Sequence, residues 1–140
     1  MIIKKAESLE EIGKAFILRY KVFVLEQKFS EEIEIDALDN IATHFIAEID
    51  EKVIGTLRLF NNDLGFSLGR MAVDIEYRKQ GIGRKLILKA IKYAERNKAD
   101  YIEAHAQTQA LDFYLKCGFE KVGDVFMEDG APHVLVKFKL

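Results

Sequence analysis

The sequence predicts an α/β fold, an α+β arrangement in which a mixed sheet is covered by helices. Two patterns lead to this prediction. Several short segments alternate apolar and polar residues, which is the period of a strand, and longer segments repeat their apolar residues every three or four positions, which is the period of a helix. In chain order the segments run β-α-(α)-β-β-β-α-β-α-β-β. The length of 140 residues predicts one domain over 1–140.

The N-terminal half opens with a predicted strand over 2–6 and a helix that begins at a capping box formed by Ser8 and Glu11. The apolar positions of this helix that we expect to face the core are Ile12, Phe16, Tyr20, Phe23 and Val24. The acidic stretch over 26–39 is expected to be a loop or a short irregular helix. Three antiparallel strands over 44–49, 52–60 and 66–74 then form a predicted meander.

The C-terminal half contains a strongly amphipathic predicted helix over 83–96, with an apolar stripe on one side and basic residues on the other. A strand over 101–105 follows, and then a short helix over 108–117 that Gly118 is expected to stop. Two further strands, over 119–126 and 134–140, are joined by a turn at 128–132.

Composition excludes several classes of protein. The net charge of −2 gives no overall basic field for nucleic acid, and no apolar run approaches the roughly 20 residues that a membrane span needs. Cys117 is the sole cysteine, so that no intramolecular disulfide can form. The histidines are widely separated and show no ligand spacing. We therefore expect a cytoplasmic protein that holds no metal and has neither nucleic acid nor membrane as a partner.

The most informative segment is the basic turn Arg78–Lys85, in which Gly81 and Gly83 lie between a predicted strand and a predicted helix. A helix N-terminus carries unpaired N–H groups and partial positive charge, and glycine lets a ligand come close. The turn is therefore a candidate cradle for phosphates. It fits neither the Rossmann fingerprint, because Leu86 occupies the third glycine position, nor the Walker A fingerprint, which needs Gly-Lys followed by Ser or Thr.

At this point the chain resembles a known family. Arg78-x-x-Gly81-x-Gly83 resembles the acetyl-CoA pyrophosphate motif of the GNAT N-acetyltransferases, and a second signature of that family is similar to Gln107-x-x-Ala110-x-x-Phe113-Tyr114-x-x-x-Gly118-Phe119. The chain also resembles one branch of this family more narrowly, the ElaA/YjcF-like group of small bacterial acetyltransferases. The residues that carry this resemblance are Leu18-Arg19, the run 22–27, Asp36, His44, Glu128-Asp129-Gly130 and Pro132-His133.

The resemblance implies a mostly antiparallel sheet of about six to seven strands and direct acetyl transfer from acetyl-CoA, the cosubstrate, to a primary amine on a small molecule. The backbones of Met71 and Val73 would bind the pantetheine arm, and N–H groups around 78–84 would hold the pyrophosphate. Gln107 stands where the family usually has asparagine. The full set implied to contact the cofactor is Met71, Ala72, Val73, Arg78, Lys79, Gln80, Gly81, Ile82, Gly83, Arg84, Gln107, Phe113 and Tyr114.

The chemistry of the transfer gives three catalytic candidates. The N–H of Val73 would polarise the thioester carbonyl, and Tyr114, a residue type that is protonated at neutral pH, would give a proton to the departing thiolate. His105 is the first candidate for a general base because histidine titrates near neutrality, and the alternatives are Glu103, Glu26 and a purely structural histidine.

The sequence gives less information about the acceptor pocket. The candidate residues for it are Arg19, Glu26, Gln27, Arg58 and Arg70. Arg58 and Arg70 lie on adjacent predicted strands, which would suit an anionic acceptor. Two other functions stay open, a non-catalytic acyl-CoA-binding sensor and a protein or peptide acetyltransferase. A homodimer is a guess that nothing in the sequence tests.

Overall fold

The computed structural model describes the backbone of residues 1–140 and all side chains except those of residues 32 and 33. Over this backbone the chain forms a sheet of seven strands in the order β1-β2-β3-β4-β5-β7-β6. The strands are β1 (Ile2–Lys5), β2 (Thr43–Ile49), β3 (Lys52–Asn62), β4 (Gly65–Val73), β5 (Tyr101–Gln107), β6 (Glu120–Glu128) and β7 (Ala131–Lys139). The pairing of β4 with β5 is parallel and the others are antiparallel, which confirms the predicted mixed, mostly antiparallel sheet.

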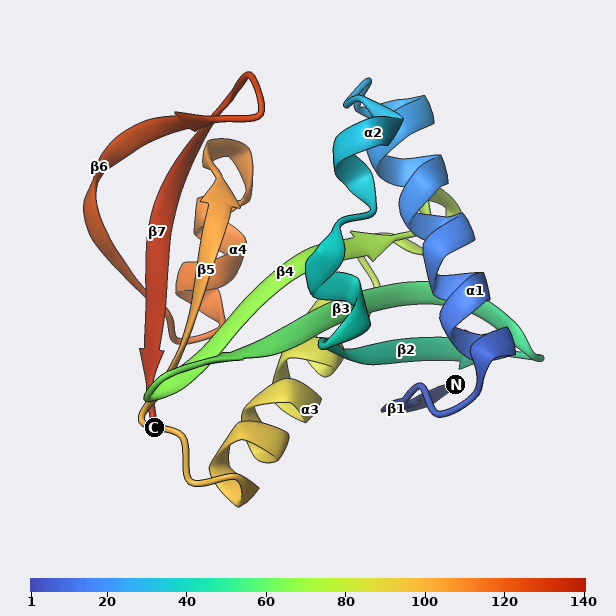
Figure 1. The fold of residues 1–140 in the computed structure, drawn as a ribbon, viewed down its shortest axis with the longest axis horizontal. Helices are drawn as coiled ribbons and strands as arrows, with labels where there is room; N and C mark the ends of the chain where they lie inside the picture. The colour runs from blue at the N-terminus through green and yellow to red at the C-terminus, as the bar shows by residue number, and fades with distance from the viewer.

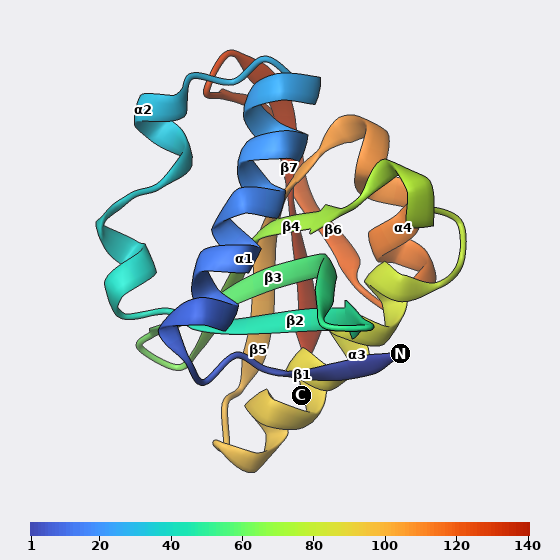
Figure 2. The ribbon, with the colours of Figure 1, turned by 90° about the vertical axis from the view of Figure 1, so that its right-hand side faces the viewer.

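Helices cover both faces of this sheet (Figures 1 and 2). The α-helices are α1 (Leu9–Arg19), α2 (Glu31–Glu34), α3 (Ile82–Arg96) and α4 (Leu111–Lys116). Short helices of other types are η1 (Tyr20–Glu26, a π-helix) and the 3-10 helices η2 (Ala37–Asn40), η3 (Ile75–Tyr77) and η4 (Thr108–Ala110). The acidic stretch predicted as a loop or irregular helix is thus the end of η1 followed by two separate short helices.

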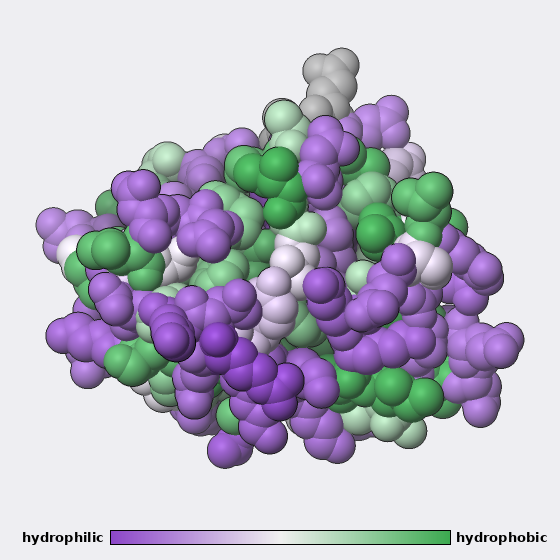
Figure 3. All heavy atoms as spheres, turned by 60° about the horizontal axis from the view of Figure 1, so that its bottom comes forward, coloured by the Kyte–Doolittle hydropathy of each residue, from purple (hydrophilic) through white to green (hydrophobic). Residues whose placement is uncertain are grey.

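The core lies in two layers. Leu86 and Ala90 of α3 pack with Phe45 and Leu57 on one side of the sheet, and Leu18 of α1 belongs to a second buried cluster on the other side. The outer side of α3 carries the basic residues that the sequence placed there, and Figure 3, which looks from the α3 side, shows hydrophilic side chains over most of the surface. No helix in the described chain is long and apolar enough to cross a membrane.

The buried side of α1 differs from the prediction. Tyr20, expected to face the core, is 41% exposed, whereas Ala15, Leu18 and Val22 are buried. Arg19 is also buried, at 1% exposure. Ile12 and Phe23 do pack against this core, as predicted, so that the apolar pattern was wrong at Tyr20 and could not assign an inward position to Arg19.

The two halves of the sheet separate between β4 and β5. These strands pair only from Phe66 to Leu68 with Ile102 to Ala104. Beyond this point β4 continues along β3, while β5 continues along β7, and Figure 1 shows β5 and β7 running at a steep angle to β2 and β3. The separation leaves an opening between the C-terminal ends of two neighbouring parallel strands, where α/β proteins commonly bind ligands.

Candidate active site

The turn that leads into α3 has the backbone geometry of an anion site. Gly81 is the N-cap of this helix and holds φ at 78°, in the left-handed region that favours glycine. None of the described side chains caps this end, so that the first-turn N–H groups lack a helical partner. Because the helix dipole also places partial positive charge here, the turn suits a phosphate group.

Gly83 is needed for a different reason, close packing. A Cβ atom at this position would lie 3.1 Å from Cζ of Phe113, so that the glycine lets the start of α3 approach α4. Ile82 is buried between the two glycines and fixes the turn to the core. The neighbouring side chains that we expected to assist with a phosphate, those of Lys79, Gln80 and Arg84, are exposed.

The free edge of β4 forms the second part of the site. The N–H of Asp74 donates to the carbonyl of Ile54 on β3, at 2.8 Å. Successive residues of a regular strand direct their N–H groups to opposite sides, so that the N–H of Val73 points away from β3 and toward the opening. Met71 lies in the irregular stretch between Ala72 and Gly69, where the register of β4 against β3 shifts. Ala72, between Met71 and Val73, is buried and opposite Thr56 of β3. The N–H of Val73 at the edge of the opening is therefore available to an extended ligand.

The guanidinium of Arg78 is already paired. It makes a bidentate ion pair with Glu26 at the end of η1, with N···O distances of 2.6 and 2.7 Å, and its Nε donates to the carbonyl of Val73 at 2.9 Å. The hydrogen bonds from Arg78 lower the pKa of the Glu26 carboxyl. Glu26, expected to be an acceptor-side residue, therefore holds Arg78 against the end of β4.

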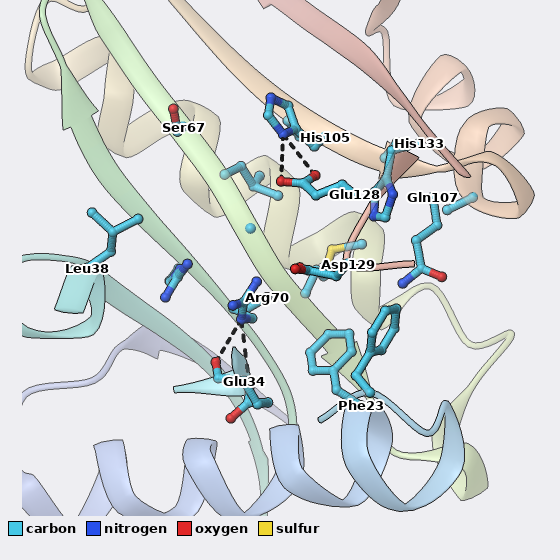
Figure 4. A pocket seen from close by; sticks show the side chains of 18 of the residues that line it. Phe23, Glu34, Leu38, Ser67, Arg70, His105, Gln107, Glu128, Asp129 and His133 are labelled. Carbon is cyan, nitrogen blue, oxygen red and sulfur yellow. Dashed lines mark hydrogen bonds and ion pairs between the residues drawn. The ribbon is translucent and has the colours of Figure 1, made fainter. Parts of the chain in front are cut away.

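A cavity of about 600 Å³ lies in the opening between the two halves of the sheet. It is lined on one side by β4, including Gly69 to Met71, and on the other by β5 from Glu103 to Gln107. The end of η1, the acidic segment around Asp36 and the turn between β6 and β7 complete the wall (Figure 4). A volume of this size is typical of small-molecule sites.

Tyr114 lies on α4 at the edge of this cavity and is 6% exposed. Its ring packs edge-on against Phe113 and Phe119, with centroids 5.4 Å away in each case. Burial raises the pKa of the Tyr114 phenol well above its usual value. The hydroxyl therefore keeps its proton at neutral pH.

His105 and Glu103 both line the cavity from β5, as expected from their spacing. His105 is exposed at 52% of its side chain and is hydrogen-bonded, so that the structural interpretation of this histidine stays open beside the catalytic one. Its Nδ1 lies 3.0 and 3.2 Å from the two carboxylate oxygens of Glu128, and its ring packs edge-on against Phe126. Glu103 accepts a hydrogen bond from Asn62 at 3.1 Å.

The three arginines proposed for the acceptor pocket are held by carboxylates. Arg19 lies in the interior, bonded to Glu34 and Asp39 at 2.7 and 2.8 Å. Arg58 and Arg70 do lie near each other, as predicted, because both contact Asp36. Arg58 is buried and also bonds Asp39, at 2.9 Å. Their positive charge is therefore largely offset before any acceptor arrives, which removes the reason for expecting an anionic acceptor.

These arginines lower the pKa values of the carboxyl groups that they contact. Burial alone would raise the pKa of Asp39, but hydrogen bonds and charge from Arg19, together with hydrogen bonds from Arg58, hold it at about 2. Hydrogen bonds from Arg58 likewise lower the pKa of Asp36. Asp36 also caps the 3-10 helix η2 by accepting from the N–H of Leu38. The ion pairs thus fix the segment that closes one side of the cavity.

Gln107 stands at the end of β5, and its amide donates to Gln27 at 3.0 Å while accepting from Gln109 at 2.6 Å. Gln27 follows Glu26, which holds Arg78 on the other side of the opening. Two adjacent residues at the end of η1 therefore connect the two separated halves of the sheet. The side chain of Gln107 is engaged with these glutamines.

Sequence reasoning did not single out Asp39 and Glu128 as site residues. Asp39 forms a capping box with Asp36, a pattern that is visible in the sequence but gives no sign of the arginines that it meets. Glu128 was noticed only as part of the family resemblance. Among the residues whose side chains are described, no group of three or more His, Cys, Asp and Glu could hold a metal ion.

Comparisons with known proteins agree with this geometry. A family model described as an acetyltransferase (GNAT) domain matches residues 4–140. The N-acetyltransferase YjcF of Bacillus subtilis, itself uncharacterized, is 36% identical over 131 residues, which cover 92% of this chain and 93% of YjcF. The crystal structure of an acyl-CoA N-acyltransferase from Pseudomonas aeruginosa superposes with a TM-score of 0.88 at 28% identity, covering 98% of this chain and 99% of that one.

A more distant structure shares the fold at 16% identity. It is an aminoglycoside 6'-N-acetyltransferase complexed with coenzyme A, with a TM-score of 0.79 over 99% of this chain and 97% of that one. The family match spans nearly the whole chain and includes both sequence signatures together with the opening between β4 and β5. The chain therefore belongs to the GNAT family of acetyltransferases and is an acyltransferase.

Proposed function

We propose that this protein transfers an acetyl group directly from acetyl-CoA to the nitrogen of a primary amine on a small molecule. The observation that carries the proposal is the opening between β4 and β5, which has an uncapped helix N-terminus at one end and the protonated Tyr114 at its edge. A cavity of about 600 Å³ favours a small acceptor over a protein or peptide. The cytoplasmic location and the homodimer stay predictions.

The residues present fit acetyl-CoA. First-turn N–H groups of α3, together with Lys79 and Arg84, would hold the pyrophosphate. The N–H groups of Met71 and Val73 would pair with the amides of the pantetheine arm as an added strand does. Bound in this way, acetyl-CoA supplies an activated thioester at the cavity.

The chain's own groups then act on that thioester. The N–H of Val73 would donate to the carbonyl oxygen as negative charge develops on it. Tyr114 would give its proton to the departing thiolate, so that the free thiol leaves. The proton that the attacking nitrogen loses would pass to Glu103, which lines the cavity from β5, or to water beside it. Walls on both sides of the opening would keep the amine in line with the carbonyl carbon, an effect that lowers the entropic part of the barrier.

Thermal melting with acetyl-CoA, CoA or ATP tests the donor site. A ligand at 100 times its Kd adds about 2.7 kcal/mol to the free energy of unfolding. For a domain of this size, each kcal/mol raises Tm by about 2–4 °C. We expect acetyl-CoA and CoA to raise Tm and ATP to leave it nearly unchanged. No shift with either CoA species at millimolar concentration would reject both acetyl transfer and the sensor alternative.

An amine panel with thiol release as the readout separates the remaining functions. Acetylation of a small amine supports the proposal, whereas CoA binding without turnover of any amine or peptide favours the sensor. On an active amine, Tyr114→Phe should lower kcat roughly 100-fold or more. The matched control is Tyr93→Phe, which removes a hydroxyl that contacts Thr43 on the α3 side of the sheet. If Tyr114→Phe is as fast as the wild type, tyrosine is not the acid.

A further inference from the structure

We propose that Glu128 selects a cationic amine as the acceptor. Its carboxylate, oriented by His105, would receive the ammonium group that an alkylamine carries at neutral pH. The inference rests on the N-acetyltransferase function proposed above and assigns its acceptor class. It makes His105 a positioning residue that acts through Glu128. The proton that the ammonium must lose before its nitrogen attacks then passes to Glu103, the other base candidate on β5 that lines the cavity, or to water beside it.

The geometry of the His105–Glu128 pair carries this assignment. Nδ1 of His105 lies 3.0 and 3.2 Å from the two oxygens of Glu128, and a carboxylate can only accept, so that the proton of this bond lies on Nδ1. In Figure 4 the carboxylate lies on the side of the ring that faces Asp129 and Arg70, and the other ring nitrogen points away from them. Both residues line the cavity, and it is the carboxylate of Glu128 that lies toward its charged wall.

Neighbouring groups hold the ring and the carboxylate in this arrangement. Phe126, on the same strand as Glu128, packs edge-on against His105 with ring centroids 5.1 Å apart. It also stacks against His133 of β7 at 6.1 Å. The imidazole is consequently fixed between two strands, with its N–H directed at Glu128. A single N–H cannot saturate both carboxylate oxygens, so that lone pairs remain for a ligand.

Three other carboxylates of the cavity are paired with cations. Glu34 and Asp36 hold arginines, and Glu103 lies 3.9 Å from the ammonium of Lys137. Glu128 differs because its partner is an imidazole, which leaves the carboxylate able to accept an ammonium. Asp129 follows it in the turn and also lines the cavity, which makes it the competing assignment.

A pair of acceptors distinguishes charge recognition from general damage to the site. An alkylamine is an ammonium ion at pH 7, whereas an arylamine is neutral. With saturating acetyl-CoA, Glu128→Gln should lower kcat/KM for the alkylamine roughly 10- to 100-fold, mainly through KM, because a charged hydrogen bond is lost. The arylamine should change less than about twofold, since a neutral amine does not use the charge.

Three further variants complete the test. Glu120→Gln, an exposed position on the same strand, should leave both amines unaffected. His105→Ala should reduce alkylamine turnover in the same direction as Glu128→Gln but less, and His105→Asn should restore it, because the asparagine amide can donate from the place of Nδ1. The rise in Tm with acetyl-CoA should be the same in all of these variants.

Each outcome supports or rejects the assignment of Glu128 as the group that binds the ammonium. If Glu128→Gln affects both amines equally, or neither, the assignment is wrong. If Asp129→Asn and not Glu128→Gln discriminates between the amines, the ammonium is read by the neighbouring carboxylate and the proposal fails. A wild type that acetylates only the arylamine overturns this inference and leaves the proposed function standing. A wild type that binds acetyl-CoA and acetylates neither amine rejects the proposed function, and this inference with it.

Discussion

The proposed donor side of the cavity consists mainly of backbone groups, whereas the proposed acceptor side consists of charged side chains. On the donor side, the turn into α3 and the free edge of β4 offer backbone N–H groups, and glycine at position 81 supplies the conformation. On the acceptor side, buried arginines and carboxylates fix the segment over 34–39, and Glu128 faces the cavity from the end of β6. The backbone site depends on local geometry, whereas the side-chain site depends on partners far apart in the sequence.

This difference has an energetic consequence. A helix N-terminus binds an anion with groups that need no partner in the free protein except water. The acceptor side instead holds ionised groups out of water, and each is tolerable only while its partner is present. Single substitutions should therefore be costly for stability on the acceptor side and mild on the donor side.

The largest effect is expected from Arg19→Met. The substitution keeps a long side chain but removes the guanidinium that bonds Glu34 and Asp39, leaving both carboxylates buried with less compensation. Breaking a buried pair in this way costs about 3–5 kcal/mol. Urea unfolding would measure the loss in the free energy of unfolding.

Glu10→Gln is the matched control for this change. Glu10 pairs with Lys14 at 3.4 Å on the same helix, and both side chains are exposed, at 78% and 36%. Exposed ion pairs contribute about 0–1 kcal/mol, so that the control should stay near the wild type. Equal losses in the two variants would contradict the view that the acceptor side depends on buried charge.

The second largest effect is expected from acid, which should lower the free energy of unfolding by protonating a buried carboxylate on the acceptor side. The pKa of Asp39 is about 2 in the folded protein against an ordinary 3.8, so that its contribution is complete above pH 4 and is lost as the pH falls toward 2. The difference corresponds to about 2 kcal/mol. The free energy of unfolding, measured between pH 6 and pH 3, should fall less steeply in Asp39→Asn than in the wild type. Parallel curves would show that this carboxylate does not carry the acid dependence.

The same division explains what the sequence could predict. The strands, α3 and the basic turn Arg78–Lys85 follow from local periodicity and glycine placement, which are properties of short segments. The ion pairs of Arg19 and Arg58 are made over 15 to 22 residues of separation, and the hydrogen bond between Gln27 and Gln107 spans 80 residues. Nothing local marks an arginine as buried, and the apolar pattern of the first helix was misread for that reason.

The smallest effect tests the donor side through a pair of glycines. Gly81 and Gly123 have nearly the same φ, 78° and 77°, and an added Cβ atom would meet nothing within 4 Å at either position. Alanine at each should therefore cost about the same stability, roughly 1 kcal/mol, for backbone strain alone.

Only Gly81 sets the direction of the first-turn N–H groups of α3, since Gly123 lies on β6. Gly81→Ala should consequently weaken CoA binding about 3- to 10-fold, while Gly123→Ala should leave it unchanged. If both variants, or neither, lose CoA affinity, the donor site is not built from this turn, and the contrast with the acceptor side would have to be abandoned.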